Sequence, residues 1–194
     1  DGYGVPIGSH YVPGAPGYVD TTGINPHDPA LAEKLLAEAG VKLPLTLTMT
    51  LPPAPYARQG GEVIAAQLAK VGIIAKLQNV EWAQWLSGTY GNKNYDLTLI
   101  SHVEPFDLGN FAKPDYYWGY ASPQFNALFE KIQTTTRPAD RARLLGDAQR
   151  LLAQDAACAF LYQPQWVTVA AKNLRGLWKD MPVFVNDLAA LSWA

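Results

Sequence analysis

Cysteine is nearly absent from this chain, whose 194 residues include a single one, Cys158. One thiol excludes an internal disulfide bond and every CxxC motif of the kind that binds zinc or exchanges electrons. Cys158 lies in the apolar run AACAFLY, residues 156–162. We therefore predict a small, buried, apolar side chain at this position.

Charge is also scarce, and its two signs are balanced. Charged residues make up 16% of the chain, and 15 Lys and Arg against 17 Asp and Glu give a net charge of -2. Nucleic-acid binding needs a basic surface, so we expect no nucleic-acid partner. Uncharged apolar runs such as residues 156–162 are far shorter than the ~20 residues that span a bilayer. We expect a soluble chain with no direct membrane insertion.

The N-terminus carries no recognisable targeting segment. The sequence opens at Asp1, without an initiator Met, a basic stretch or an apolar stretch. This start indicates either that such a segment has been removed or that the chain is a piece of a longer protein.

Several catalytic signatures are missing. Neither GxGxxG after a strand nor GxxxxGK[ST] occurs, and GxSxG and HExxH are absent too. Ser101 and His102 are adjacent, but successive side chains of a strand point to opposite faces. Their spacing therefore argues against a serine nucleophile activated by this histidine.

What the sequence does contain is a strand-helix pattern that repeats. Asp28 and Pro29 have the types of a helix N-cap and first position, and Gly40 suits the helix end. The chain then reads as strand 45–51, a break at 52–56, helix 57–72, strand 73–80, a shorter helix within 81–94 and strand 95–103. Strands separated by crossover helices indicate a parallel βαβαβ sheet.

Two tandem helices and a strand-rich tail follow this pattern. Ser122 and Pro123 repeat the helix-start signature, and a second helix within 137–156 places Leu144, Leu145, Ala148, Leu151 and Leu152 on one face. Strand-like runs cover 159–171 and 183–194. Residues 1–25 are rich in Gly and Pro and predict an extended loop.

Candidate functional residues gather where the predicted strands end. Pro52 to Tyr56, Trp82 with Trp85, and His102 to Phe111 follow three strands, and ligands of parallel sheets bind at the carboxyl ends of strands. Aromatic rings together with an acidic group favour an amphipathic or cationic ligand.

The residues alone are also consistent with two other kinds of site. His102, Glu104 and Asp107, with His27 or His10, are a plausible set of ligands for a first-row metal. A carboxylate pair made by Glu104 with Asp107 or Asp115 could instead hydrolyse a glycoside, with Trp and Tyr rings stacking on the sugar.

The order of segments resembles a known family, the family 5 extracellular solute-binding proteins of ABC importers. The resemblance rests on these segments in this order: DPALAEKLLAEAGV, LPLTLTMTLPP, ARQGGEVIAAQLAKVGIIAKLQNVEWAQWL, NYDLTLISHVEPFDLGNF, GYASPQFNALFEKIQTTTRPADRARLLGDAQRLLAQDA and FLYQPQWVTVAAKNLRGL. It implies an α/β fold, one lobe of a type II periplasmic binding protein with a mainly parallel sheet flanked by helices. It further implies that residues 1–180 form the second, C-terminal lobe and that 181–194 form a strand crossing back toward an absent first lobe.

The resemblance also implies a non-enzymatic, cofactor-free function. The protein would capture a peptide-like or other small polar solute for an ABC importer permease, in the periplasm or, membrane-associated, outside a Gram-positive cell. A nickel-type metal-chelate binder of the same fold, or a carboxylate-pair hydrolase, is the alternative.

The implied site departs from the family pattern at two positions. Glu104 falls at the aspartate that pairs with the ligand's amino group in peptide-binding members, and Ser101 falls at a tryptophan. We expect Glu104 to make the charged contact, His102 and Asp107 to shape the pocket, and Trp82, Trp85 and Trp118 to form its walls.

Overall fold

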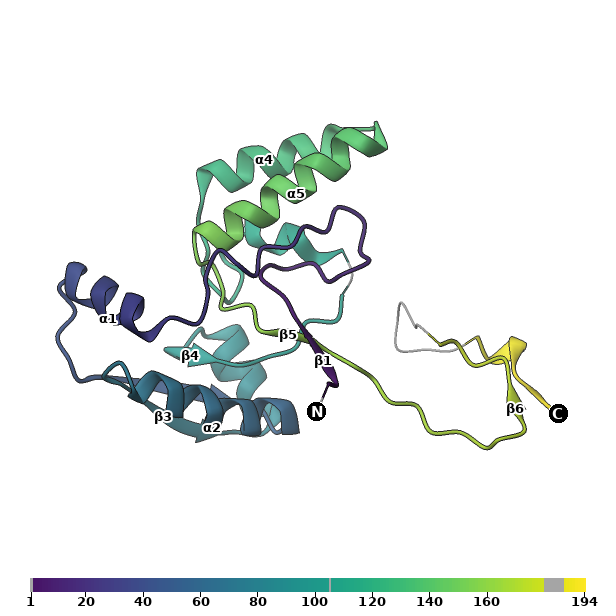
Figure 1. Ribbon diagram of the computed structural model, residues 1–194, viewed down its shortest axis with the longest axis horizontal. Helices are drawn as coiled ribbons and strands as arrows, with labels where there is room; N and C mark the ends of the chain where they lie inside the picture. Colours follow the sequence, from purple (N-terminus) through teal and green to yellow (C-terminus); the bar gives the residue numbers. More distant parts are fainter. Residues whose placement is uncertain (1, 105, 180–186) are drawn as a thin grey trace. The chain divides into compact units, whose positions relative to one another are not determined.

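The computed structural model describes residues 2–104, 106–179 and 187–194, and the chain divides into two compact units (Figure 1). Unit 1 consists of Asp1–Asn25, Val103–Ala112 and Ser122–Ala194, and unit 2 of Pro26–His102 and Lys113–Ala121. Neither unit is continuous in sequence, because the chain leaves unit 2 after His102 and returns to it at Lys113.

Unit 2 is built on a three-stranded parallel sheet. Its strands are β2 (Leu45–Leu51), β3 (Ile73–Asn79) and β4 (Leu97–Thr98), in the spatial order β3-β2-β4. Leu45 pairs with Ile73 and Met49 with Leu97, so both neighbours run parallel to β2. The βαβαβ prediction is confirmed.

Four helical segments accompany this sheet: α1 (Pro29–Glu38), α2 (Pro55–Ala69), α3 (Trp82–Gln84) and the π-helix η1 (Trp85–Gly91). The side chain of Asp28 accepts a hydrogen bond from Leu31 N, as expected of an N-cap. Gly72 has φ +82°, a left-handed conformation that favours glycine and ends the turn after α2. Helix α2 begins within the segment 52–56 that the sequence predicted as a break.

The two faces of β2 meet different helices because its side chains alternate between Leu or Met and Thr. Leu51 is fully buried toward α2, where a Cβ on Gly61 would lie only 2.5 Å from Leu51 Cδ1. Glycine at this position lets the helix approach the sheet closely. Thr50 points to the opposite face, which η1 covers. The alternation thus produces one apolar interface and one that is rich in hydroxyl groups.

Strand β4 is much shorter than the predicted strand 95–103. At both ends of β4, side chains replace the backbone hydrogen bonds that a longer strand would make. The Asp96 carboxylate accepts a hydrogen bond from Thr48 N at 2.7 Å, and the Tyr56 hydroxyl accepts one from Ser101 N at 2.9 Å. The chain therefore leaves the sheet after Thr98, and His102 stands on a loop rather than on a strand.

Unit 1 is built around the tandem helices α4 (Pro123–Thr134) and α5 (Pro138–Gln154). Ser122 caps α4 by accepting from Phe125 N at 3.2 Å, as predicted. Leu145, Ala148, Leu151 and Leu152 of α5 are buried and Leu144 is half-buried, so the predicted apolar face is confirmed. The 3-10 helix η2 (Asp107–Ala112) adds the buried Leu108 and Phe111 to this core.

The N-terminal segment is more ordered than the sequence predicted. Residues 1–25 were expected to form only a loop, but β1 (Gly4–Pro6) pairs antiparallel with β5 (Tyr162–Pro164). Gln149 of α5 joins the segment to the helix, since its amide accepts from Ser9 Oγ and donates to Gly17 O. These contacts lie more than 130 residues apart in sequence, so no local pattern could reveal them.

Among the described residues of the C-terminal part, the strands are short. Its elements are β6 (Leu174–Arg175), the 3-10 helix η3 (Leu188–Ala190) and β7 (Ser192–Trp193), and β6 pairs antiparallel with β7. The predicted strand over 159–171 shrinks to β5, and β6 lies between the two predicted strand-like runs. The predicted strand 183–194 lies partly outside the described residues, and the crossing segment 181–194 stays a prediction.

Candidate functional site

Eight rings of unit 2 form what we call the aromatic cluster. Its members are linked pairwise by short ring-to-ring distances: Trp82, Trp85, Tyr90, Tyr95, His102, Tyr116, Tyr117 and Trp118. They come from α3 and η1, from the chain around β4, and from the segment Lys113–Ala121. Three separate parts of the sequence are therefore brought together beside one end of the sheet.

Trp85 is the buried centre of the aromatic cluster. Its side chain is 4% exposed, and its indole N–H donates to Thr98 Oγ1 at 3.0 Å. Thr98 Oγ1 in turn donates to Thr50 O at 2.7 Å, which ties η1 to β4 and β2. Trp82 packs edge-on against Trp85, with centroids 6.1 Å apart, and is 45% exposed. Trp85 thus holds Trp82 in place at the surface.

His102 is fixed by two neighbours in the aromatic cluster. Its Nε2 lies 2.8 Å from the Tyr117 hydroxyl, and the two rings stack with an interplanar angle of 6°. The Trp118 ring centroid is 5.2 Å from that of His102. Tyr95 supports this arrangement, because its hydroxyl donates to Tyr117 O at 2.7 Å. Two of the predicted site residues, His102 and Trp118, are therefore in ring contact.

The remaining two predicted residues belong to unit 1. Glu104 is exposed, and its carboxylate accepts from Val103 N at 3.1 Å. Asp107 opens η2 and contacts His10 through Oδ1 and Nε2, and these two side chains are only 9% and 10% exposed. The His10 ring also meets Phe111 edge-on at 5.2 Å. The sequence showed no signal for the His10–Asp107 pair, because 97 residues separate them.

The alternative sites can be placed residue by residue. Carboxylate oxygens of Glu104 and Asp107 lie within 4.8 Å of each other. Of the other residues proposed for them, His10 belongs to unit 1, whereas His102, His27 and Asp115 belong to unit 2, and His27 and Asp115 are exposed. Asp107 is already engaged by His10. The metal set and the hydrolytic pair stay hypotheses.

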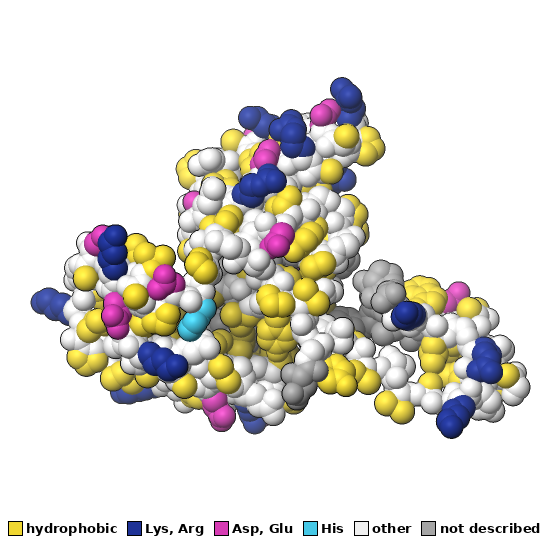
Figure 2. All heavy atoms as spheres, viewed as in Figure 1, with side chains coloured by type: hydrophobic (Ala, Val, Ile, Leu, Met, Phe, Trp, Pro, Cys, Tyr) yellow, Lys and Arg dark blue, Asp and Glu magenta, His cyan; other side chains and the backbone are white. Residues whose placement is uncertain are grey.

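Charged side chains show no concentration on the face of the molecule drawn in Figure 2. Lys and Arg are dispersed there over several elements, and acidic side chains lie among them. Along α5, Asp147 lies 2.9 Å from Arg150 and 3.5 Å from Arg143, so basic groups are paired locally. Among the described residues, no helix is both long and apolar enough to cross a bilayer.

The chain is similar in sequence to a known family and to known proteins. The profile of the bacterial extracellular solute-binding proteins, family 5 (middle region), matches residues 1–126. A di/tripeptide-binding protein 4 from Pseudomonas aeruginosa (strain UCBPP-PA14) is 29% identical over 197 residues, which covers 94% of this chain.

Solved structures with a similar fold superpose on the chain. The oligopeptide-binding protein AppA from Bacillus subtilis, in complex with a nonapeptide, matches with a TM-score of 0.83 at 18% identity, over all of this chain and 43% of that one. NikA from Staphylococcus aureus, in complex with Ni(L-His)2, matches with a TM-score of 0.72 at 18% identity, over 83% of this chain and 37% of that one. These likenesses support the predicted α/β fold of a periplasmic binding-protein lobe.

The chain spans 37% of the length of the Pseudomonas relative. The family profile nevertheless covers more than half of the chain, and it does so across the sheet, the aromatic cluster and the loop that carries Glu104. The resemblance read from the sequence is confirmed: the chain belongs to the bacterial extracellular solute-binding proteins of family 5.

Proposed function

We propose that the protein containing this chain is the solute-binding component of an ABC importer and that its ligand is a short peptide. The observation that carries the proposal is the family match over residues 1–126, which includes both the aromatic cluster and Glu104. The peptide assignment is supported by a relative named as a di/tripeptide-binding protein at 29% identity. In this proposal the protein acts outside the cytoplasm, delivers its ligand to a membrane permease and catalyses no reaction.

Each predicted site residue receives a role in this proposal. Glu104 is exposed and carries a carboxylate that can pair with the ammonium group of a peptide. The exposed ring of Trp82 and the half-buried ring of Trp118 offer apolar contact for peptide side chains, and His102, held by Tyr117, offers a hydrogen bond. Trp85 and Asp107 act through their neighbours, because the first is buried and the second is engaged by His10.

The domain division also belongs to the proposal. Residues 1–180 constitute most of the second lobe of a two-lobed protein, and residues 181–194 cross toward the first lobe. Hinge closure of two lobes around a ligand is a general mechanism of capture by periplasmic binding proteins.

The role of Glu104 is tested by titrating the protein that contains this chain with Ala-Ala in a calorimeter. Charge-assisted hydrogen bonds contribute about 1.5–3 kcal/mol, so the Glu104→Gln variant should bind about tenfold to a hundredfold more weakly. N-acetyl-Ala-Ala lacks the ammonium group and should bind the unmodified protein no better than Ala-Ala binds the variant.

The matched control for this test is Glu62→Gln, which removes an exposed carboxylate on α2. It should leave the affinity for Ala-Ala unchanged. Equal affinities of the Glu104→Gln variant and the unmodified protein would refute the assigned role of Glu104. Recovery of intact dipeptide after long incubation is expected of a binder, and cleavage would refute the non-enzymatic assignment.

A nickel chelate is the second candidate ligand, because NikA, described with Ni(L-His)2, has the same fold. His102 and Glu104 are residues of the types that bind such a complex. Calorimetry with Ni(II)-histidine separates the candidates. Saturable binding of the chelate without binding of any di- or tripeptide would select the nickel assignment over the peptide one.

A further inference from the structure

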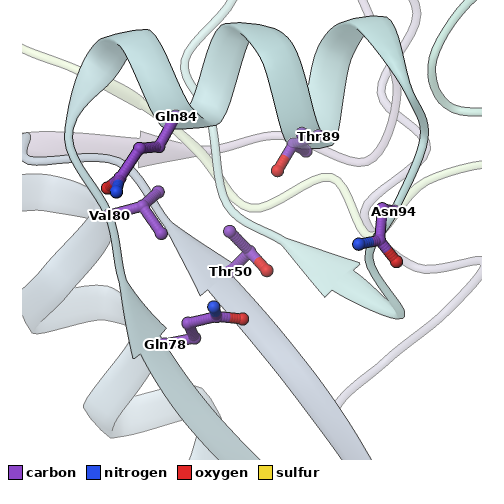
Figure 3. Close-up of a pocket in the computed structure, with 7 residues that line it drawn as sticks. Thr50, Gln78, Val80, Gln84, Thr89 and Asn94 are labelled. Carbon is purple, nitrogen blue, oxygen red and sulfur yellow. The ribbon is translucent and has the colours of Figure 1, made fainter.

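Unit 2 contains a pocket of about 180 Å³ that none of the aromatic-cluster residues lines. Figure 3 shows it between the ends of β2 and β3 and the helical turns of α3 and η1. Its side-chain lining consists of Thr50, Gln78, Val80, Gln84, Thr89 and Asn94. Residues from two strands, both helical segments and the turn before β4 thus surround one space.

The lining carries hydrogen-bonding groups but no charge. Thr50 is 5% exposed and Thr89 is 1% exposed, so their hydroxyl groups lie deep. Gln78, Gln84 and Asn94 are exposed and place carboxamides nearer the solvent. Each hydroxyl and each carboxamide both donates and accepts hydrogen bonds. Val80 supplies the apolar part of the wall.

Most of these groups can form further hydrogen bonds. The Gln84 side-chain oxygen accepts from Glu81 N at 3.1 Å, which leaves its amide N–H groups as donors. Within the part of the chain that the structure describes, the hydroxyls of Thr50 and Thr89 and the amides of Gln78 and Asn94 have no hydrogen-bond partner in the protein. Neither hydroxyl is among the buried side-chain atoms that lack a partner, so both are open to the solvent in the pocket and can pair with water or with a ligand.

We propose that this pocket is a second binding site, distinct from that of the proposed importer function, and that it takes a small uncharged polyol. Hydroxyl groups of a polyol donate and accept in the same way as the lining groups, and a neutral lining would leave an ionic ligand uncompensated. A water occupies about 30 Å³ in the liquid, so the pocket holds about six waters or a polyol of three to six carbons in their place. The site rests on unit 2 alone.

The site is tested by NMR titration of the ¹⁵N-labelled protein with erythritol. Saturable shifts of the side-chain amide signals of Gln78, Gln84 and Asn94 are expected, with the indole signal of Trp82 unmoved. Thr50→Val replaces the hydroxyl by a methyl group of similar shape and should weaken binding about fivefold. Thr46→Val, on an exposed position of β2, is the matched control and should bind as the unmodified protein does.

A second variant keeps the test decisive if Thr50→Val does not fold. Gln78→Ala changes an exposed position at the end of β3 and should also weaken erythritol binding. Non-saturable shifts, or equal affinities in Thr50→Val, Gln78→Ala and Thr46→Val, would overturn the site. Saturable binding of acetamide without erythritol binding would overturn the polyol assignment. The Thr50→Val variant should bind Ala-Ala as the unmodified protein does. A loss of erythritol binding alone would then concern this pocket and not the proposed importer function.

Discussion

At the scale of single residues, Cys158 illustrates how burial sets reactivity, although its side chain is half-buried rather than fully buried as predicted. Burial raises the pKa of its thiol from 9.0 to about 11. The folded protein therefore keeps the thiol proton to higher pH than the unfolded chain does. The contribution of the thiol to stability is complete below pH 9 and is lost as the pH rises through about 11.

The same shift predicts slow alkylation of Cys158. Because the thiolate is the nucleophile, a rise of about two units lowers its fraction at pH 8 by about a hundredfold. Iodoacetamide should therefore react with the folded protein about a hundredfold more slowly than with the same protein in guanidinium chloride, as measured by mass spectrometry. The folded-state rate should rise until about pH 11. Equal rates in both states at pH 8 would contradict the shift.

At the scale of elements, Gln149 attaches the N-terminal segment to α5. Its side chain is fully buried and bonds Ser9 Oγ, Gly17 O and Leu145 O. Gln149→Leu would leave the Ser9 hydroxyl and the Gly17 carbonyl without this partner. We expect the free energy of unfolding in urea to fall by about 2–3 kcal/mol.

Limited proteolysis adds a local measure of the same change, because a detached N-terminal segment would be cut near Tyr11 or Tyr18. The control is Gln154→Leu, on an exposed position of the same helix, which should change the unfolding free energy by less than about 0.5 kcal/mol. Unfolding curves of Gln149→Leu that match those of the unmodified protein would rule out the anchoring role.

Local patterns predicted the elements whose own residues determine them. The Leu-Thr alternation of β2 and the caps at Asp28 and Ser122 are read within a few residues, and the structure confirms all three. The length of β4 depends instead on the Tyr56 hydroxyl, 45 residues away from Ser101. Strand β1 likewise depends on β5 at the other end of the chain. Sequence periodicity carries no information about such distant partners.

The candidate site likewise has features that the sequence predicted and features that it did not. The gathering of Trp82 and Trp85 with the loop that begins at His102 was predicted, because these segments follow predicted strands. The burial of Trp85 and the engagement of Asp107 by His10 were not, since both depend on tertiary packing. Ring stacking of His102 on Tyr117 also brings together segments that belong to different parts of the chain.

At the scale of the whole molecule, the family assignment predicts that this chain alone is a weak peptide binder. A two-lobed protein encloses its ligand, and a single lobe leaves one side of the ligand in water. The chain spans 37% of the length of its Pseudomonas relative. We expect calorimetry with di- and tripeptides to give an affinity at least about a hundredfold lower for the 194-residue chain than for the longer protein that contains it.

The comparison of the two affinities requires that the 194-residue chain is folded on its own. The circular dichroism of the chain should show its helices, and the Trp85 indole N–H should keep an NMR signal protected by its bond to Thr98. Under those conditions, micromolar peptide binding by the chain alone would contradict capture between two lobes. It would instead mean that this chain suffices for binding, because nothing from a first lobe would then be needed.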